Sequence, residues 1–90
     1  MLKDVISVIP LERYQLKLRF EDGLEGVVDV TEIITLEGVF EPLRDQDFFN
    51  QVRIDSETGV VCWPNGADLD SVVLYSRVTG QAIESVLKAL

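Results

Sequence analysis

Residues 59–70 decide the fold of this chain, and they read Gly-Val-Val-Cys-Trp-Pro-Asn-Gly-Ala-Asp-Leu-Asp. The β-branched residues before Trp63 favour a strand. Pro64 presets φ at the second position of a tight turn, Asn65 tolerates the third position, and Gly66 suits the fourth. Because a residue that precedes proline stays extended, Trp63 lies at the mouth of this turn. The stretch therefore predicts a strand that ends in a proline turn.

A helix is predicted directly after this turn. Asp70 or Ser71 can cap a helix that begins near Val72, because both side chains accept hydrogen bonds from free backbone N–H groups. The dipeptide Thr79-Gly80 interrupts this helix. These twelve residues therefore predict a strand, a turn and the start of a helix.

The predicted strand 60–63 is apolar on both faces. Such a strand is either covered on both sides or offers one side to a partner, and both alternatives stay open. Trp63 has the same two interpretations. Its ring can fill the core, which is the usual place for tryptophan, or it can anchor a partner.

Residues 13–30 predict a β-hairpin whose register can be derived from its alternation. Tyr14, Leu16, Leu18 and Phe20 share one face, and basic or amide side chains share the other. A three-residue turn, Glu21-Asp22-Gly23, keeps the apolar face intact, whereas a two-residue turn would set Phe20 opposite Glu25. The predicted outer-face pairs are Arg19 with Glu25 and Gln15 with Asp29.

Shorter sequence patterns predict the remaining strands and helices. Residues 5–11 predict a first strand, and residues 52–55 with 59–63 predict a second hairpin. Asp29 or Thr31 can cap a short helical segment that Gly38 stops, and Asp45 can cap a helix that carries Phe48, Phe49 and Val52. Residues 81–90 predict an amphipathic helix. We expect one α+β domain, residues 1–90, with a small antiparallel sheet of about five strands in two hairpin-like units, and short helices.

Charge limits the classes of partner. The 90 residues include 8 basic and 16 acidic side chains, a net charge of −8, which disfavours nucleic acid and anionic membranes and favours a basic protein. One cysteine cannot form an internal disulfide, and no apolar run is long enough to span a membrane. We expect a cytoplasmic protein without membrane contact.

No catalytic arrangement is recognisable. The chain has no histidine, which excludes Ser-His-Asp and Cys-His centres. Cys62 lies in an apolar strand and is interpreted as a small core residue. Asp68 and Asp70 can in principle bind calcium or magnesium, but their spacing matches no known loop, and helix capping is the simpler explanation. We expect no enzyme activity, catalytic residue, metal ligand or cofactor.

Several short segments occur together in one known family. They are Tyr14-Gln15-Leu16, Phe20-Glu21-Asp22-Gly23, Val28-Asp29, Val39-Phe40-Glu41-Pro42-Leu43-Arg44-Asp45 with Phe48, Trp63-Pro64-Asn65-Gly66-Ala67-Asp68-Leu69 and Leu74-Tyr75. Through them the chain resembles the bacterial family called domain of unknown function 2442, over about residues 5–75. The resemblance implies a small α+β domain without an established activity or cofactor. Members look like partners encoded beside small toxin-like proteins, which implies an antitoxin or adaptor role.

Two functional hypotheses follow. The first is a non-enzymatic protein-interaction module, an antitoxin-like partner or adaptor for a basic toxin-like protein. The second is a small-molecule or metal-ion sensor that uses a corner formed by Asn65, Asp68 and Asp70. The oligomeric state stays open, because an exposed apolar stripe on the tail helix would favour a homodimer and a docked stripe would favour a monomer. The candidate interface residues are Trp63, Asn65, Asp68, Tyr75, Ile83, Val86, Leu87 and Leu90.

Overall fold

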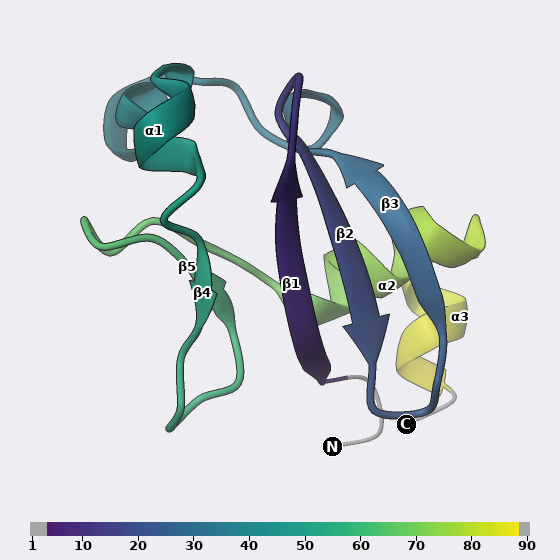
Figure 1. The fold of residues 1–90 in the computed structure, drawn as a ribbon. Coiled ribbons are helices and arrows are strands. Elements are labelled where there is room, and N and C mark those ends of the chain that lie inside the picture. The colour runs from purple at the N-terminus through teal and green to yellow at the C-terminus, as the bar shows by residue number, and fades with distance from the viewer. Residues whose placement is uncertain (1–3, 89–90) are drawn as a thin grey trace.

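The computed structural model describes residues 4–88 and contains two three-stranded antiparallel sheets (Figure 1). The first sheet consists of β1 (Val5–Leu11), β2 (Gln15–Phe20) and β3 (Glu25–Asp29), in that order. Its register confirms the predicted hairpin, because Leu18 pairs with Gly26 and Arg19 pairs with Glu25. The alternation of the sequence is therefore sufficient to fix this register.

The turn between β2 and β3 has the predicted three residues. The Gly23 N–H donates to the Phe20 carbonyl at 2.9 Å, and the Phe20 N–H donates to the Leu24 carbonyl at 2.8 Å. Gly23 has φ of 92°, a conformation that glycine adopts without steric cost. The start of β2 differs from the prediction. Arg13 and Tyr14 have φ of 60° and 61° and belong to the preceding turn, so the strand begins two residues later than the alternation indicates.

The second sheet contains β4 (Arg53–Ile54), β5 (Val61–Cys62) and β6 (Asp68–Leu69), in that order. The hairpin between β4 and β5 is as predicted. The strand β6 was not predicted, because two residues are too few to show an alternation. The structure thus has six strands in two sheets among the described residues, where the sequence indicated about five strands in one small sheet.

The turn between β5 and β6 repeats the geometry of the turn between β2 and β3. The Gly66 N–H donates to the Trp63 carbonyl at 3.0 Å, and the Trp63 N–H donates to the Ala67 carbonyl at 2.9 Å. Gly66 has φ of 90°. The Asn65 side chain accepts the Ala67 N–H at 3.2 Å. Both hairpins therefore close through a three-residue loop that ends in a left-handed glycine.

Three of the helical segments have an aspartate as their N-cap. Asp29 accepts the Thr31 N–H at the start of η1 (Val30–Glu32), and Asp45 accepts the Asp47 N–H at the start of α1 (Gln46–Phe49). Asp70 accepts the Val72 N–H at the start of α2 (Ser71–Thr79), and Gly80 ends this helix with φ of 75°. These caps agree with the sequence, since capping depends on a residue and its nearest neighbours.

Two helical predictions need correction. Gly38 does not stop a helix that begins at Asp29 but opens the 3-10 helix η2 (Gly38–Arg44). The helix α1 is one turn long, so Val52 falls outside it and cannot share a helical stripe with Phe49. The last helix, α3 (Ile83–Lys88), lies within the predicted range 81–90. Residues in these segments are held by contacts with distant parts of the chain, which local patterns do not reveal.

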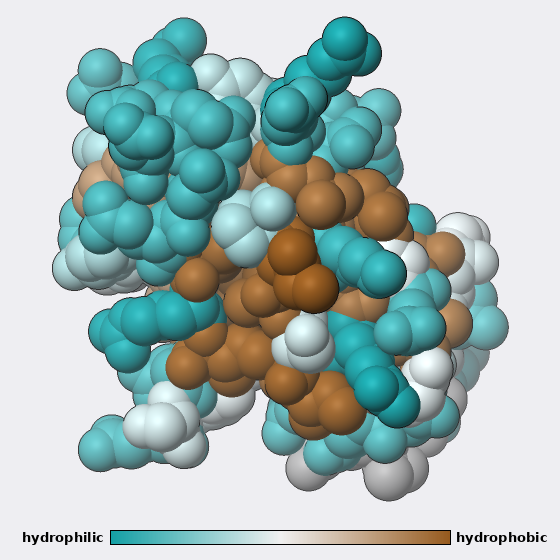
Figure 2. All heavy atoms as spheres, viewed as in Figure 1, coloured by the Kyte–Doolittle hydropathy of each residue, from teal (hydrophilic) through white to brown (hydrophobic). Residues whose placement is uncertain are grey.

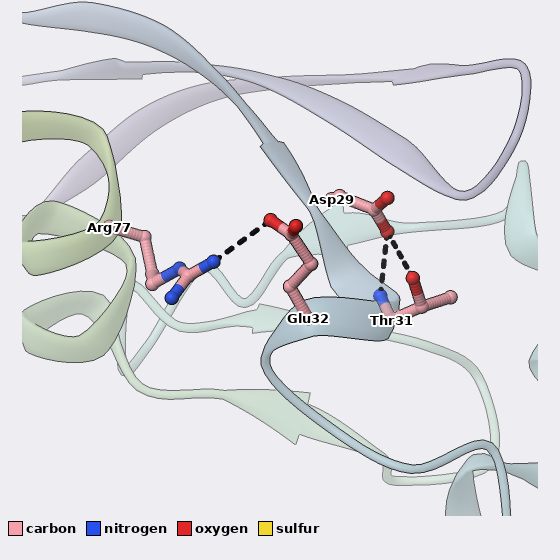
Figure 3. A network of polar contacts seen from close by, with 4 residues as sticks. All are labelled: Asp29, Thr31, Glu32 and Arg77. Atoms are coloured by element: carbon pink, nitrogen blue, oxygen red, sulfur yellow. Dashed lines mark hydrogen bonds and ion pairs between the residues drawn. The ribbon is translucent and has the colours of Figure 1, made fainter.

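One apolar core joins both sheets, and α2 and α3 lie behind the first sheet in Figure 1. A close approach of α2 to β3 depends on Gly26, because a Cβ atom there would lie 2.5 Å from Cγ1 of Val78. On the same side of the molecule, Arg77 of α2 forms an ion pair of 2.8 Å with Glu32, next to the capping contact between Asp29 and Thr31 (Figure 3). Among residues 4–88, no helix is long and apolar enough to cross a membrane.

Candidate functional site

Trp63 lies in the core. Its side chain is 1% exposed, and its Nε1–H donates to the Phe49 carbonyl at 2.9 Å. The ring also packs against that of Phe49, with 5.8 Å between the ring centroids. Of the two alternatives that the sequence left open for Trp63, the ring fills the core. It is not accessible to a partner in this conformation.

The tail helix docks on its own chain. Val86 is fully buried in the core, and α3 contacts α2. Ile83 and Leu87 remain about half exposed on the outer side of α3. Tyr75 of α2 is buried as well, and its hydroxyl donates to the Asp22 carboxylate at 2.6 Å. Leu90, the last residue of the predicted interface stripe, lies outside the described residues.

The corner predicted from Asn65, Asp68 and Asp70 is not assembled as one ligand site. The Asn65 side-chain amide donates to the Val39 carbonyl at 2.8 Å and so ties the turn to η2. Asp70 caps α2. Asp68 is exposed on β6 and has neither of these structural tasks. Within residues 4–88 there is no group of three or more His, Cys, Asp or Glu side chains that could hold a metal ion.

The two faces of β5 have different environments. The sequence left open whether this strand is covered on both sides or offers one side to a partner. Val61 and Trp63 point into the core and are almost completely buried. Val60 and Cys62 alternate with them, and both line a cleft of about 360 Å³. The cleft is lined by Arg53, Asp55, Thr58, Val60, Cys62, Trp63, Pro64, Gly66 and Asp68. One face of the strand is therefore core, and the other borders an open cleft.

Opposite charges flank the apolar centre of this cleft. Arg53 pairs with Cys62 across the sheet, and Cys62 pairs with Asp68, so the three residues form one row. With neighbouring strands about 4.8 Å apart, the backbones of the two charged residues are about 10 Å apart. Among residues 4–88, neither charged side chain forms an ion pair. Both remain available to a bound molecule.

Asp55 adds a second carboxylate to the lining of the cleft. Its Oδ1 accepts the N–H groups of Thr58 at 3.0 Å and of Glu57 at 2.8 Å. These hydrogen bonds hold the pKa of the Asp55 carboxyl below its ordinary value of 3.8, and the bond from Thr58 has the larger effect. The group is thus ionised at neutral pH, and the lining residues carry two negative charges and one positive charge.

Cys62 is 7% exposed and buried as the sequence predicted, but it borders the cleft and does not belong to the main core. Sequence reasoning did not find the cleft. The sequence feature that could have indicated the cleft was the strand 60–63 with two apolar faces, because its outer face had to be buried by another element or bind a ligand. The arrangement offers an apolar floor between charges of both signs, which suits binding and supplies no activated nucleophile.

A second surface lies on the outer face of the first sheet. Ile9 and Val27 are 48% and 52% exposed, and Lys17 lies between them in the same cross-strand row. Figure 2 shows the apolar side chains gathered in the middle of this view, over β1 and its neighbours, with hydrophilic side chains between them. In Figure 1 β4 and β5 lie beside β1, whereas α3 lies behind the first sheet.

The chain was compared with families and individual proteins. Neither the curated proteins nor the solved structures include a significant match. The model of the family described as "Protein of unknown function (DUF2442)" matches residues 5–80. This match covers both sheets and α2, and it leaves α3 outside. The chain therefore belongs to the DUF2442 family.

Proposed function

We propose that this chain is a non-enzymatic protein-interaction module that binds a basic protein through the cleft on β4, β5 and β6. The observation that carries the proposal is the cleft itself, with Val60 and Cys62 as an apolar floor and carboxylates of Asp55 and Asp68 beside them. The role is that of an antitoxin-like partner or an adaptor for a toxin-like protein.

Charge supports a basic partner. The chain carries a net charge of −8, which attracts a basic protein over long distance and raises its association rate. At the cleft, a lysine or arginine of the partner can lay its aliphatic stem on the apolar floor and direct its cation to Asp68. Arg53 at the other side can bind a carboxylate of the same partner.

The test is capture from the native host with a variant of the cleft. Asp68→Arg reverses the charge at one side of the cleft, and Glu12→Arg makes the same change of net charge in a turn that does not line it. We expect the wild type and Glu12→Arg to capture the same basic protein. Asp68→Arg should bind it at least about tenfold more weakly, because a like charge then faces the partner's cation.

Equal loss of binding in both variants, or an acidic captured protein, would contradict the proposal. The antitoxin-like role is decided by expressing the captured protein alone and together with this chain. If the captured protein inhibits growth and the chain relieves that inhibition, the role is antitoxin-like. If the captured protein has no effect on growth, an adaptor role remains.

A second candidate function is the binding of a small ligand in the same cleft. Its volume of about 360 Å³ lies in the range of ligand pockets, and the row of Arg53, Cys62 and Asp68 suits a molecule with an anionic and a cationic end. A thermal shift screen with zwitterions, calcium and magnesium tests it. A ligand present at 100 times its dissociation constant stabilises a fold by about 2.7 kcal/mol, so a flat screen rejects this candidate.

A further inference from the structure

The middle row of the outer face of the first sheet has an apolar side chain at each end and a lysine between them, and charged residues occupy the neighbouring rows. Ile9, Lys17 and Val27 form the middle row, and the next row contains Arg19 and Glu25. The two apolar residues of the middle row are about half exposed, and no helix covers this face in Figure 1. Because the aliphatic stem of Lys17 lies between these two apolar side chains, the row offers apolar surface to a partner.

The charges of this face are balanced, in contrast to the rest of the chain. Lys17 and Arg19 on β2 are matched by Glu25 and Asp29 on β3. The whole chain carries −8, so the excess of negative charge lies elsewhere on the molecule. Two copies of the chain repel each other least when they meet through this face. Charge therefore favours a second copy as the occupant of the face.

We propose that this face binds a second copy of the chain and forms a symmetric dimer. A two-fold axis that runs along the strands, between β2 and β3 of the facing sheets, sets Arg19 of each copy opposite Glu25 of the other. The same axis sets Lys17 opposite Val27, so its aliphatic stem covers an apolar side chain. Arg19 and Glu25 of one chain are in register but form no ion pair among residues 4–88, so both can bind across the dimer.

The shape of the face is consistent with this contact. A depression of about 140 Å³ lies beside Lys17, and its lining is Ser7, Ile9, Lys17, Leu18, Arg19 and Glu25. In the proposed arrangement, Val27 of the second copy lies next to this depression. Shape thus places an apolar side chain against a depression whose lining includes Ile9, Leu18 and the aliphatic stem of Lys17 beside charged groups.

The size of the face predicts a weak dimer. Three strands about 4.8 Å apart and five residues long cover about 10 by 14 Å between backbone axes. Such a patch lies at or below the low end of specific interfaces, which is about 1,200 Å² of total buried surface. We therefore expect dissociation in the micromolar range, and the dimer has to be measured at up to several hundred micromolar of chain.

The experiment combines sedimentation equilibrium with amide NMR on the full chain. The wild type should dimerise reversibly, and its concentration-dependent amide shifts should cluster on β2 and β3. Arg19→Glu and Glu25→Arg each bring like charges together across the axis at two symmetric places, which should weaken the dimer by at least about tenfold. The double variant Arg19→Glu with Glu25→Arg restores opposite charges and should recover wild-type affinity.

Two control variants separate this contact from a general effect of charge. Lys88→Glu matches the charge change of Arg19→Glu, and Glu12→Arg matches that of Glu25→Arg, but neither residue lies on the face. A wild type that stays monomeric, a dimer that the controls weaken equally, or a double variant that stays weak would each overturn the proposal. The wild-type NMR shifts decide the matter even if a variant fails to fold, because shifts that avoid β2 and β3 also overturn it.

Discussion

Gly26→Ala tests how α2 packs against β3. A Cβ atom at Gly26 would lie 2.5 Å from Cγ1 and 3.2 Å from Cγ2 of Val78. Valine is stiff at χ1 in a helix, so Val78 cannot rotate away without leaving its preferred rotamer. Overpacking of this kind costs about 1 to 3 kcal/mol. Replacing glycine within a strand returns about 0.5 to 1 kcal/mol, so we expect a net loss of about 1 kcal/mol within a range from about 0 to 2.5 kcal/mol.

The measurement is equilibrium unfolding in urea, supported by thermal melts. For a domain of this size, a loss of 1 kcal/mol lowers the melting temperature by about 4 to 8 °C. Val78→Ala removes both clashing methyl groups and by itself costs up to about 2 kcal/mol, because each buried methylene contributes about 0.8 kcal/mol.

The double variant Gly26→Ala with Val78→Ala is the decisive comparison. If the clash is the cause, the double variant is more stable than the sum of the single losses predicts, by about 1 kcal/mol or more. Simple additivity of the two single losses would refute the close packing of α2 on β3. Positive φ occurs at other glycines and not at Gly26, so backbone strain does not contribute to the effect of an alanine at this position.

Three further predictions concern single side chains. Trp63→Phe leaves the Phe49 carbonyl without its 2.9 Å donor and should cost about 1 to 3 kcal/mol in urea unfolding, whereas an unchanged midpoint would contradict the buried bond. Asp70→Ala removes the cap on the Val72 N–H and should cost about 1 kcal/mol by the same assay. The lowered pKa of Asp55 means that its hydrogen bonds stabilise the fold above about pH 4 and lose this effect as the pH falls through the lowered pKa. The stability difference between wild type and Asp55→Asn should therefore shrink on acidification, and a constant difference between pH 7 and pH 2 would disprove the coupling.

The two candidate surfaces of this chain differ in chemistry, and this difference separates their partners. The cleft on the second sheet carries more negative than positive charge and has room for a side chain, which suits a basic protein. The outer face of the first sheet is balanced in charge and carries the half-exposed Ile9 and Val27 in its middle row, which suits a second copy. A dimer through the first sheet leaves the lining residues of the cleft outside the interface.

Much of the local structure was predictable from the sequence. The register of β2 and β3 follows from the alternation of residues 14–30, because a shift by one residue would move every apolar side chain to the solvent face. The three-residue turns at Gly23 and Gly66 and the caps at Asp45 and Asp70 depend only on residues within a few positions. Family membership was also recognisable, since short motifs carry it.

The candidate site depended on contacts that the sequence does not display. Trp63 packs in the core, where the Phe49 carbonyl, fourteen positions away, satisfies its N–H. Val86 faces the core and Leu87 does not, because α2 lies on only one side of α3. On the other face of β5, Val60 and Cys62 line a cleft. The sequence by itself determined the strands, turns and caps, whose energies are local, and only tertiary packing decided which apolar faces are buried and which stay open to a partner.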